Sequence, residues 1–446
     1  MKNKPFLLFM ALLTLQQMQA QTQIQDTDGD TRLQTEALPN ENKIRLVTAG
    51  ADRLHIGANA AGITRIDVWN ANQCLFIGQN AGINAQAGAS NNTGLGYMAG
   101  SAITTGFANT LAGQNAGKSI NTGNSNTAFG QNALLFNTSG HSNVAVGSAS
   151  LQAVITGTNN TAVGTSALVS NTASENTAVG SSALQNNTSG SNNTAMGRRA
   201  AQLNTTGSAN TSVGQEALRE NTTGGSNTAI GRSAMLNNQT GSNNTAIGVN
   251  AGDQSSGNNQ CTFLGFDADN TLNNNLNNAT AIGNGARVNT SNKIRLGNSA
   301  VTVIEGQVAY TVSDGRFKTD VQENAPGLDF VMGLRPVTYH FNYPGFSGFL
   351  GEKSVDNAVL RQKEQQREMG FVAQEVETLC LHQGVELSNI VHVPDSDADN
   401  YSVAYGQLVV PLVKAVQEQQ TQIAAQRAEI ETLKQMVAQL LAQTPS

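Results

Sequence analysis

The chain has 446 residues and a net charge of −6; only 13% of its residues are charged and 5% are aromatic. Low aromatic content with low charge is unlike an ordinary globular domain, and also unlike a disordered chain, in which charge is usually high. The mild charge and the lack of a basic patch with interleaved aromatic residues argue against a nucleic-acid partner. What remains is a repetitive fold in which small residues stack regularly.

The N-terminus is typical of an export signal. Two lysines precede an apolar run that starts at Phe6, and Ala20 ends a suitable cleavage site, so residues 1–20 are expected to be a signal peptide. The apolar run is shorter than the roughly 20 residues that a membrane-spanning helix needs. We therefore expect an exported protein without a transmembrane segment, located at the cell surface or outside the cell. Residues 21–53 are expected to be a separate N-terminal segment.

One repeated unit dominates residues 54–290. It reads Asn-Thr-Ala, then Val, Ile or Phe, then Gly, two variable residues, Ala-Leu and a turn rich in Asn, Thr, Ser and Gly. Most steps between units are 17 residues long. The glycines that close the five-residue core are Gly57, Gly78, Gly96, Gly113, Gly130, Gly147, Gly164, Gly180, Gly197, Gly214, Gly231, Gly248, Gly265 and Gly283.

The repeat predicts a β-solenoid. Each unit has a short strand such as Thr161–Val163 and a second apolar pair such as Ala167 and Leu168, and neither can bury its apolar face without identical neighbours above and below. The repeated glycine fits a tight corner or a positive φ, where a Cβ is costly. Asn and Thr suit turns and can form side-chain ladders between coils. We expect a mainly β fold with a long solenoid (β-roll) of about 14 coils.

The repeat resembles the head repeats of trimeric autotransporter adhesins, which also use an Asn/Ser-x-Ala-Val/Ile-Gly core. The resemblance covers residues 54–290 and implies left-handed β-rolls that associate as trimers. It leaves open whether the solenoid is a passive shaft or binds a cell-surface or glycan ligand directly. A glycan-cleaving solenoid is not favoured, because acidic residues such as Glu175, Glu216 and Asp253 are scattered over variable turn positions and form no convincing acid–base pair.

No cofactor and no metal site are expected. Cys74, Cys261 and Cys380 are far apart, lack the spacing of metal ligands and are odd in number, which also argues against a disulfide framework. Two aspartate-rich stretches, residues 26–30 and 395–400, look like calcium loops. The twelfth position of each lacks the glutamate that calcium loops use, so calcium is not favoured.

A different composition follows the repeat. Residues 291–312 are expected to form a neck, after which charge increases and the Asn/Thr pattern disappears. The sequence Ser-Asp-Gly-Arg-Phe-Lys runs from Ser313 to Lys318. Downstream, Leu-Arg-Pro-Val-Thr-Tyr-His-Phe starts at Leu334 and Gly-Phe-Val-Ala-Gln-Glu starts at Gly370.

This ordered set of motifs resembles the peptidase S74 family, the intramolecular chaperone domain of phage endosialidase tail spikes, a domain type that also occurs in tail fibres. The resemblance covers nearly all of residues 313–446 and implies a small α+β chaperone domain over residues 313–407. It also implies a catalytic dyad of Ser313 and Lys318, with cleavage just before the serine, between Val312 and Ser313.

The implied dyad has a plain chemical logic. A serine hydroxyl needs a nearby base to become a nucleophile, and a lysine can be that base only when its surroundings keep it neutral. Ser313 follows the bond to be cut, so its Oγ can reach the preceding carbonyl and form an ester that water then hydrolyses. Completion of the dyad across subunits is an alternative. Asp314 and Arg316 are expected to support the site by fixing the turn.

The C-terminal residues 408–442 are expected to form a helix that enters a coiled coil. Leu433 and Leu440 occupy one position of its heptad. Apolar residues recur every seven residues at the other, at Val416, Ile423, Ile430 and Val437. This spacing predicts a coiled-coil seam and, with the resemblances above, a homotrimer. The alternative is a single amphipathic helix packed on its own domain.

Two functions from different classes are compatible with these features. The first is an exported, trimeric fibre or adhesin-like surface protein whose S74 domain assists trimer assembly and then cuts itself off, as a single-turnover serine autoprotease. The second is a trimeric adhesin that retains the domain as a non-cleaving clamp. A phage tail fibre is a third interpretation, but an export signal is hard to reconcile with assembly in the cytoplasm.

Overall fold

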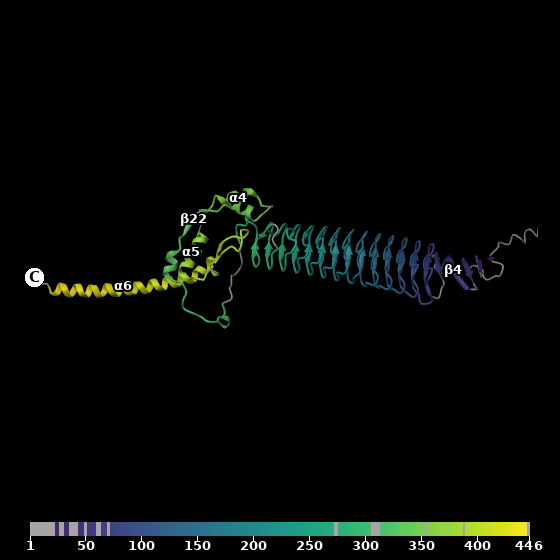
Figure 1. The fold of residues 1–446 in the computed structure, drawn as a ribbon, viewed down its shortest axis with the longest axis horizontal. Helices are drawn as coiled ribbons and strands as arrows, with labels where there is room; N and C mark the ends of the chain where they lie inside the picture. Colours follow the sequence, from purple (N-terminus) through teal and green to yellow (C-terminus); the bar gives the residue numbers. More distant parts are fainter. Residues whose placement is uncertain are drawn as a thin grey trace, which may run out of the picture. The chain divides into compact units, whose positions relative to one another are not determined.

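The computed structural model describes residues 72–271, 275–304, 313–352, 355–386 and 389–443, together with the backbone of five strands between residues 23 and 68. The expected signal peptide and Val312 lie outside the described residues. The chain divides into two compact units, residues 1–227 and residues 228–446. Figure 1 shows the ribbon, in which coil follows coil along the solenoid.

The strands nearest the N-terminus form an antiparallel sheet. Its strands pair in chain order: β1 (Gln23–Gln25), β2 (Thr31–Gln34), β3 (Lys43–Thr48), β4 (Ala51–Ala58) and β5 (Thr64–Val68). Gly57, expected to close the first coil, lies in β4, opposite Lys43 of β3 and Arg65 of β5. Because β4 is antiparallel to both neighbours, the parallel coils begin only at residue 75.

The solenoid is a stack of three-residue parallel strands. Among the described residues there are 14 such strands in one sheet, which confirms the expected fold and number of coils. They are β6 (Leu75–Ile77), β7 (Thr93–Leu95), β8 (Thr110–Ala112), β9 (Thr127–Phe129), β10 (Val144–Val146), β11 (Thr161–Val163), β12 (Thr177–Val179), β13 (Thr194–Met196), β14 (Thr211–Val213), β15 (Thr228–Ile230), β16 (Thr245–Ile247), β17 (Thr262–Leu264), β19 (Thr280–Ile282) and β21 (Ile294–Leu296). Near the end of the stack, β18 (Asp269–Asn270) and β20 (Arg287–Val288) form a second parallel pair.

Strand alternation places small side chains inside each coil. In β11 the middle residue, Ala162, is completely buried, whereas Val163 points outward and is exposed. The second apolar pair of the same unit, Ala167 and Leu168, is also completely buried. The interior is therefore filled by alanine and leucine stacked on their counterparts in neighbouring coils.

A ladder of buried asparagines joins the coils. Asn160 is typical: its Oδ1 accepts the backbone N–H of Asn176 at 3.0 Å, and its Nδ2 donates to the Ala173 carbonyl at 2.9 Å. A buried amide with both ends paired carries no unsatisfied group into the core. Cys261 takes the asparagine's place near the end of the ladder, where its backbone N–H donates to Asn244 Oδ1 at 2.9 Å.

The repeated glycine permits close stacking. Gly164 has φ of +134°, a conformation that L-residues rarely adopt, and an added Cβ would lie 2.6 Å from the Gly180 carbonyl carbon in the next coil. The positive φ and the close approach of the next coil are the physical reasons why the repeat has glycine at this position.

The last coil extends into the expected neck. β21 pairs in parallel with β19, so that Ile294 lies opposite Thr280. The number of coils agrees with the expectation because this coil, closed by Gly297, replaces the one expected at Gly57.

The C-terminal region is a small mixture of helices and strands, as expected. Its elements are η1 (Gly315–Phe317), α2 (Leu328–Gly333), β22 (Val337–His340), α3 (Tyr343–Phe349), α4 (Asn357–Glu364), β23 (Arg367–Gly370), α5 (Ala373–Gln383), β24 (Val391–His392), β25 (Ser402–Val403), η3 (Tyr405–Leu408) and α6 (Val409–Gln443). β22 pairs antiparallel with β23, and β24 with β25. The core is centred on Phe330, Val376, Cys380, Ile390 and Leu408.

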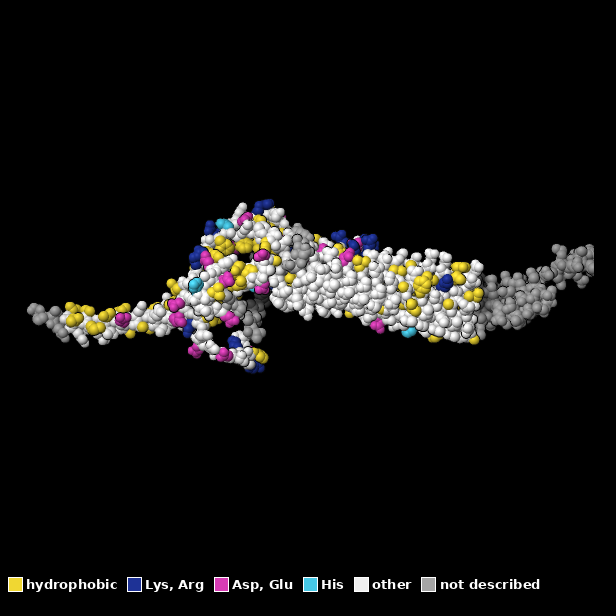
Figure 2. Space-filling view, in the orientation of Figure 1, with side chains coloured by type: hydrophobic (Ala, Val, Ile, Leu, Met, Phe, Trp, Pro, Cys, Tyr) yellow, Lys and Arg dark blue, Asp and Glu magenta, His cyan; other side chains and the backbone are white. Residues whose placement is uncertain are grey.

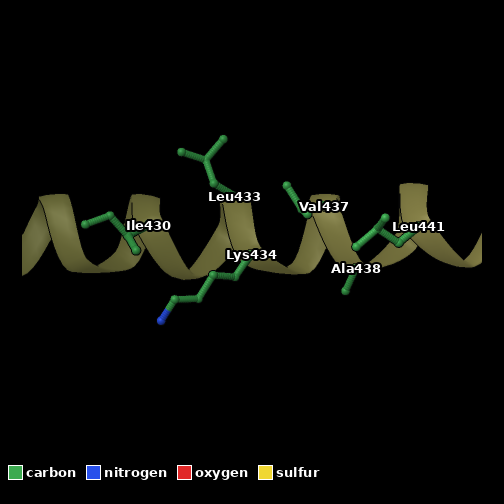
Figure 3. A pocket seen from close by; sticks show the side chains of 6 residues that line it. All are labelled: Ile430, Leu433, Lys434, Val437, Ala438 and Leu441. Carbon is green, nitrogen blue, oxygen red and sulfur yellow. The ribbon is translucent and has the colours of Figure 1, made fainter.

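The 35-residue helix α6 is only partly covered within one chain. Near its start, Glu418 Oε2 accepts the backbone N–H of Leu328 in α2 at 2.7 Å. From residue 419 to residue 442 every residue is exposed. Hydrophobic side chains nevertheless follow this stretch (Figure 2), and Ile430, Leu433 and Val437 line one hollow on it (Figure 3). Packing on its own domain, the alternative to a coiled coil, thus accounts for the first turns alone.

We predict that Gly164→Ala destabilises the solenoid, because the new Cβ would be forced against the next coil at a strained φ. Strain of this kind costs about 1–3 kcal/mol before any displacement of the coil. Gly88→Ala is the control, since Gly88 is not at a positive φ and its Cβ would approach the next coil no closer than 3.1 Å, at Cγ2 of Thr105. Chemical denaturation of both variants measures the free energy of unfolding; equal losses would contradict the stacking argument.

Candidate functional site

Ser313 and Lys318 lie in direct contact at the start of the C-terminal region. Lys318 Nζ donates a hydrogen bond to Ser313 Oγ over 2.8 Å. The two residues are five positions apart, and the short 3-10 helix η1 between them turns the chain back on itself. The pair therefore has the distance that proton transfer from a serine to a lysine requires.

Asp314 caps this turn. Its Oδ1 accepts a hydrogen bond from the backbone N–H of Arg316 at 2.9 Å. Its Oδ2 accepts two hydrogen bonds from the Arg316 side chain, from Nε at 2.9 Å and from Nη2 at 2.6 Å. The turn closes where the backbone N–H of Lys318 donates to the Gly315 carbonyl at 3.2 Å. Residues 314–318 therefore form one turn, in which Asp314 holds the backbone that places Lys318 beside Ser313.

Hydrogen bonds within the turn hold Asp314 ionised. The guanidinium of Arg316 and, to a lesser degree, its backbone N–H lower the pKa of Asp314 below its ordinary value. A carboxyl group with a lowered pKa stabilises the turn above its ordinary pKa, and that contribution is lost only as the pH falls through the lowered pKa.

The Ser313–Lys318 pair lies on an exposed segment. Ser313 and Lys318 are both exposed, and a Cβ added at Gly315 would meet no other atom within 4 Å. Two large apolar side chains of the same segment, Phe317 and Val321, are 76% and 78% exposed.

A second charged pair joins two of the sequence motifs. Arg335, from the Leu-Arg-Pro motif, donates through Nε to Glu375 Oε2 at 2.9 Å and through Nη2 to Oε1, in a fork geometry. The hydrogen bonds from Arg335 lower the pKa of Glu375. The sequence placed both residues in motifs but assigned no role to Arg335, because 40 residues separate them and no local spacing links them.

Neither a metal site nor a membrane span is found within the described ranges. No three His, Cys, Asp or Glu side chains are grouped there to hold a metal ion. In the same residues, no helix combines the length and the apolar character that crossing a membrane requires. Cys74, Cys261 and Cys380 are not joined in disulfides.

Comparison with known protein families finds a match within the C-terminal region. Residues 313–384 match the peptidase S74 family model, which is described as a chaperone of endosialidase. The match starts at Ser313 and contains the serine–lysine contact and the Arg335–Glu375 pair. No curated protein and no solved structure matches the chain. The chain thus combines a β-solenoid body with a C-terminal segment, residues 313–384, that is similar to the S74 family.

We predict that Arg316→Met raises the pKa of Asp314 toward its ordinary value, because the largest cause of the shift is removed. NMR titration of aspartate carboxyl carbons measures this change. Arg361→Met in α4 is the control, since it removes the same charge from the domain without a contact to Asp314 and should leave that pKa where it is. An unchanged Asp314 pKa in Arg316→Met would contradict the capping geometry.

Proposed function

We propose that the C-terminal region is a self-cleaving intramolecular chaperone of an exported, trimeric, solenoid-bodied fibre or adhesin-like protein. It assists the assembly of three chains and then cuts itself off between Val312 and Ser313. The observation that carries this proposal is the 2.8 Å contact of Lys318 Nζ with Ser313 Oγ, at the first residue of the segment that matches the S74 family.

The chemistry follows from the position of the serine. Neutral Lys318 takes the proton of Ser313 Oγ, which attacks the carbonyl carbon of Val312. The Val312–Ser313 amide bond breaks, the lysine returns the proton to the departing nitrogen, and an ester links Val312 to the serine oxygen. Water then hydrolyses the ester, leaving a carboxylate on Val312 and a free amino group on Ser313.

The exposure of the dyad supports a requirement for assembly. A lysine in water is charged at neutral pH and cannot accept a proton, whereas burial favours its neutral form. The segment that carries the dyad exposes Phe317 and Val321, so a neighbouring copy that covers these side chains would also exclude water from Lys318. Cleavage would then take place only after chains have come together.

The outer face of the solenoid supports self-association. The last residue of most three-residue strands is apolar and points outward, so that the stack carries a row of exposed apolar side chains (the apolar row). Ten members are between 36% and 59% exposed: Ile77, Leu95, Phe129, Val163, Met196, Ile230, Ile247, Leu264, Ile282 and Leu296. A continuous apolar row on a water-facing sheet is unusual for a monomer and suits packing against other copies.

A chaperone suits a body built in this way. Neighbouring coils are nearly identical, so pairing with a wrong coil costs little, and non-local parallel pairing is slow. A domain that brings three C-termini together limits these errors while the solenoid forms. Cutting the chain afterwards leaves a product that is kinetically trapped, because the element that promoted folding is no longer part of the same chain.

We predict that the wild-type chain, expressed without residues 1–20, splits between Val312 and Ser313, whereas Ser313→Ala and Lys318→Ala stay whole. Intact mass measures the products after folding. Lys434→Ala is the matched control, because it removes an exposed lysine that pairs only with Glu431 in α6, and it should be cleaved like the wild type. A wild type that stays whole would favour the retained, non-cleaving clamp of a trimeric adhesin.

We also predict that charges in the apolar row weaken the trimer. Val163→Asp combined with Val179→Asp places carboxylates at the last strand residue of adjacent coils, exposed at Val163 and half-exposed at Val179. Light scattering after size exclusion should show dissociation at concentrations where the wild type is trimeric. Thr165→Asp combined with Ser181→Asp is the control, with the same charges in the same coils but outside the row. Equal masses for both double variants would show that the row is not an interface.

A further inference from the structure

The last coil of the solenoid contacts the C-terminal domain through a first charged cluster. Lys293, just before β21, donates from Nζ to Asp399 Oδ1 at 2.9 Å and to Asn400 Oδ1 at 3.4 Å. Asn289 accepts from the same ammonium group at 3.0 Å and donates through Nδ2 to the Ala398 carbonyl at 2.9 Å. The carboxylate side chain of Asp399 has no exposed surface, so its lysine partner on the coil is its main charge compensation.

The domain's own groups complete the environment of Asp399. His392 Nε2 lies 2.6 Å from Asp399 Oδ2, and the backbone N–H of Asn400 donates to Oδ1 at 2.8 Å. Burial acts to raise the pKa of Asp399, but the hydrogen bonds from Lys293, Asn400 and His392 outweigh it and lower the pKa. Asp399 is therefore ionised at neutral pH and needs the cation that the coil supplies.

A second cluster joins the same coil to the helical part of the domain. The side chain of Glu352, which has no exposed surface, accepts the backbone N–H of Ser299 at 3.1 Å and also its hydroxyl, and lies 3.5 Å from Arg295 Nη2 of β21. In return, Lys363 of α4 donates from Nζ to the carbonyls of Ser299 and Val301 at 2.7 and 3.0 Å.

The two clusters form a docking interface, defined here as Asn289, Lys293, Arg295 and Ser299 of the coil with Glu352, Lys363, Asp399 and Asn400 of the domain. The two buried carboxylates, Asp399 and Glu352, belong to the domain, and the cations that face them, Lys293 and Arg295, belong to the coil. Such pairs add little net affinity over apolar contacts, yet removal of one partner leaves a buried charge unpaired and is strongly destabilising. The interface therefore specifies one docked position.

We infer that the domain is held on the last coil by this docking interface, so that a cut in the chain between the two does not by itself release it. The cleaved domain then remains as a non-covalent cap on the end of the solenoid. The cut in the natural protein rests on the proposed self-cleavage, whereas the docking of the domain on the last coil does not. The partner is residues 289–301 of this same protein.

The test uses the full chain and does not depend on self-cleavage. In Ser313→Ala, a recognition sequence for a site-specific protease is inserted between Ile304 and Ser313, and the protein is cut at neutral pH. Size exclusion then separates bound from released fragments. We expect the two fragments to co-elute. Immediate separation of the fragments in this protein would overturn the inference, whatever the outcome of the self-cleavage experiment.

Single substitutions show whether the charged clusters hold the domain. Lys293→Met takes from Asp399 the cation that the coil supplies and should raise the rate constant of fragment release at least tenfold, whereas Lys434→Met, which removes an exposed lysine, should not change it. Asp399→Asn added to Lys293→Met should bring the release rate part of the way back, because the double variant no longer buries a carboxylate that lacks its lysine partner. If Lys293→Met fails to fold, Lys363→Met tests the second cluster. If both Lys293→Met and Lys363→Met release the fragment at the wild-type rate, the charged clusters do not hold the domain.

Discussion

The contact between glycines of successive coils is the constraint on which the rest of the structure depends. Gly164 lies so close to Gly180 that no side chain fits between the coils, and the same closeness brings the strands into pairing distance. Neighbouring coils such as those of β11, β12 and β13 consequently offer one another the same edge, Thr, Ala and an apolar residue, in the same register. Stability of the stack and ambiguity of its pairing arise from one cause.

The C-terminal end of the stack resolves this ambiguity locally. The interior position that is leucine in Leu168 becomes Asp269 and then Arg287 in the last coils, and both are buried. Arg287 Nη2 lies 2.7 Å from Asp267 Oδ2, and Nη1 lies 3.3 Å from Asp269. Omission of a coil here would bury Arg287 without its carboxylates, a far larger penalty than mispairing of two leucine coils. The stack is therefore best defined where it meets the domain.

The sequence predicted the interior of the solenoid because the period alone determines which residues point inward. It did not predict the ends, since Gly57 and Gly297 each follow a short apolar run, and such a run does not reveal whether its partners are parallel or antiparallel. The Ser313–Lys318 contact followed from a resemblance carried by local motifs. Lys293 and Asp399 could not be paired from sequence, because 106 residues separate them without any pattern.

The difference in burial between the docking interface and the dyad implies an order of events. The carboxylates of Asp399 and Glu352 are buried within a single chain, so the domain can take its place on the last coil as soon as that chain folds. Ser313 and Lys318 remain exposed at that stage. Docking therefore comes first, and under the proposed function cleavage follows only after a later event, such as the arrival of further chains, covers Ser313 and Lys318.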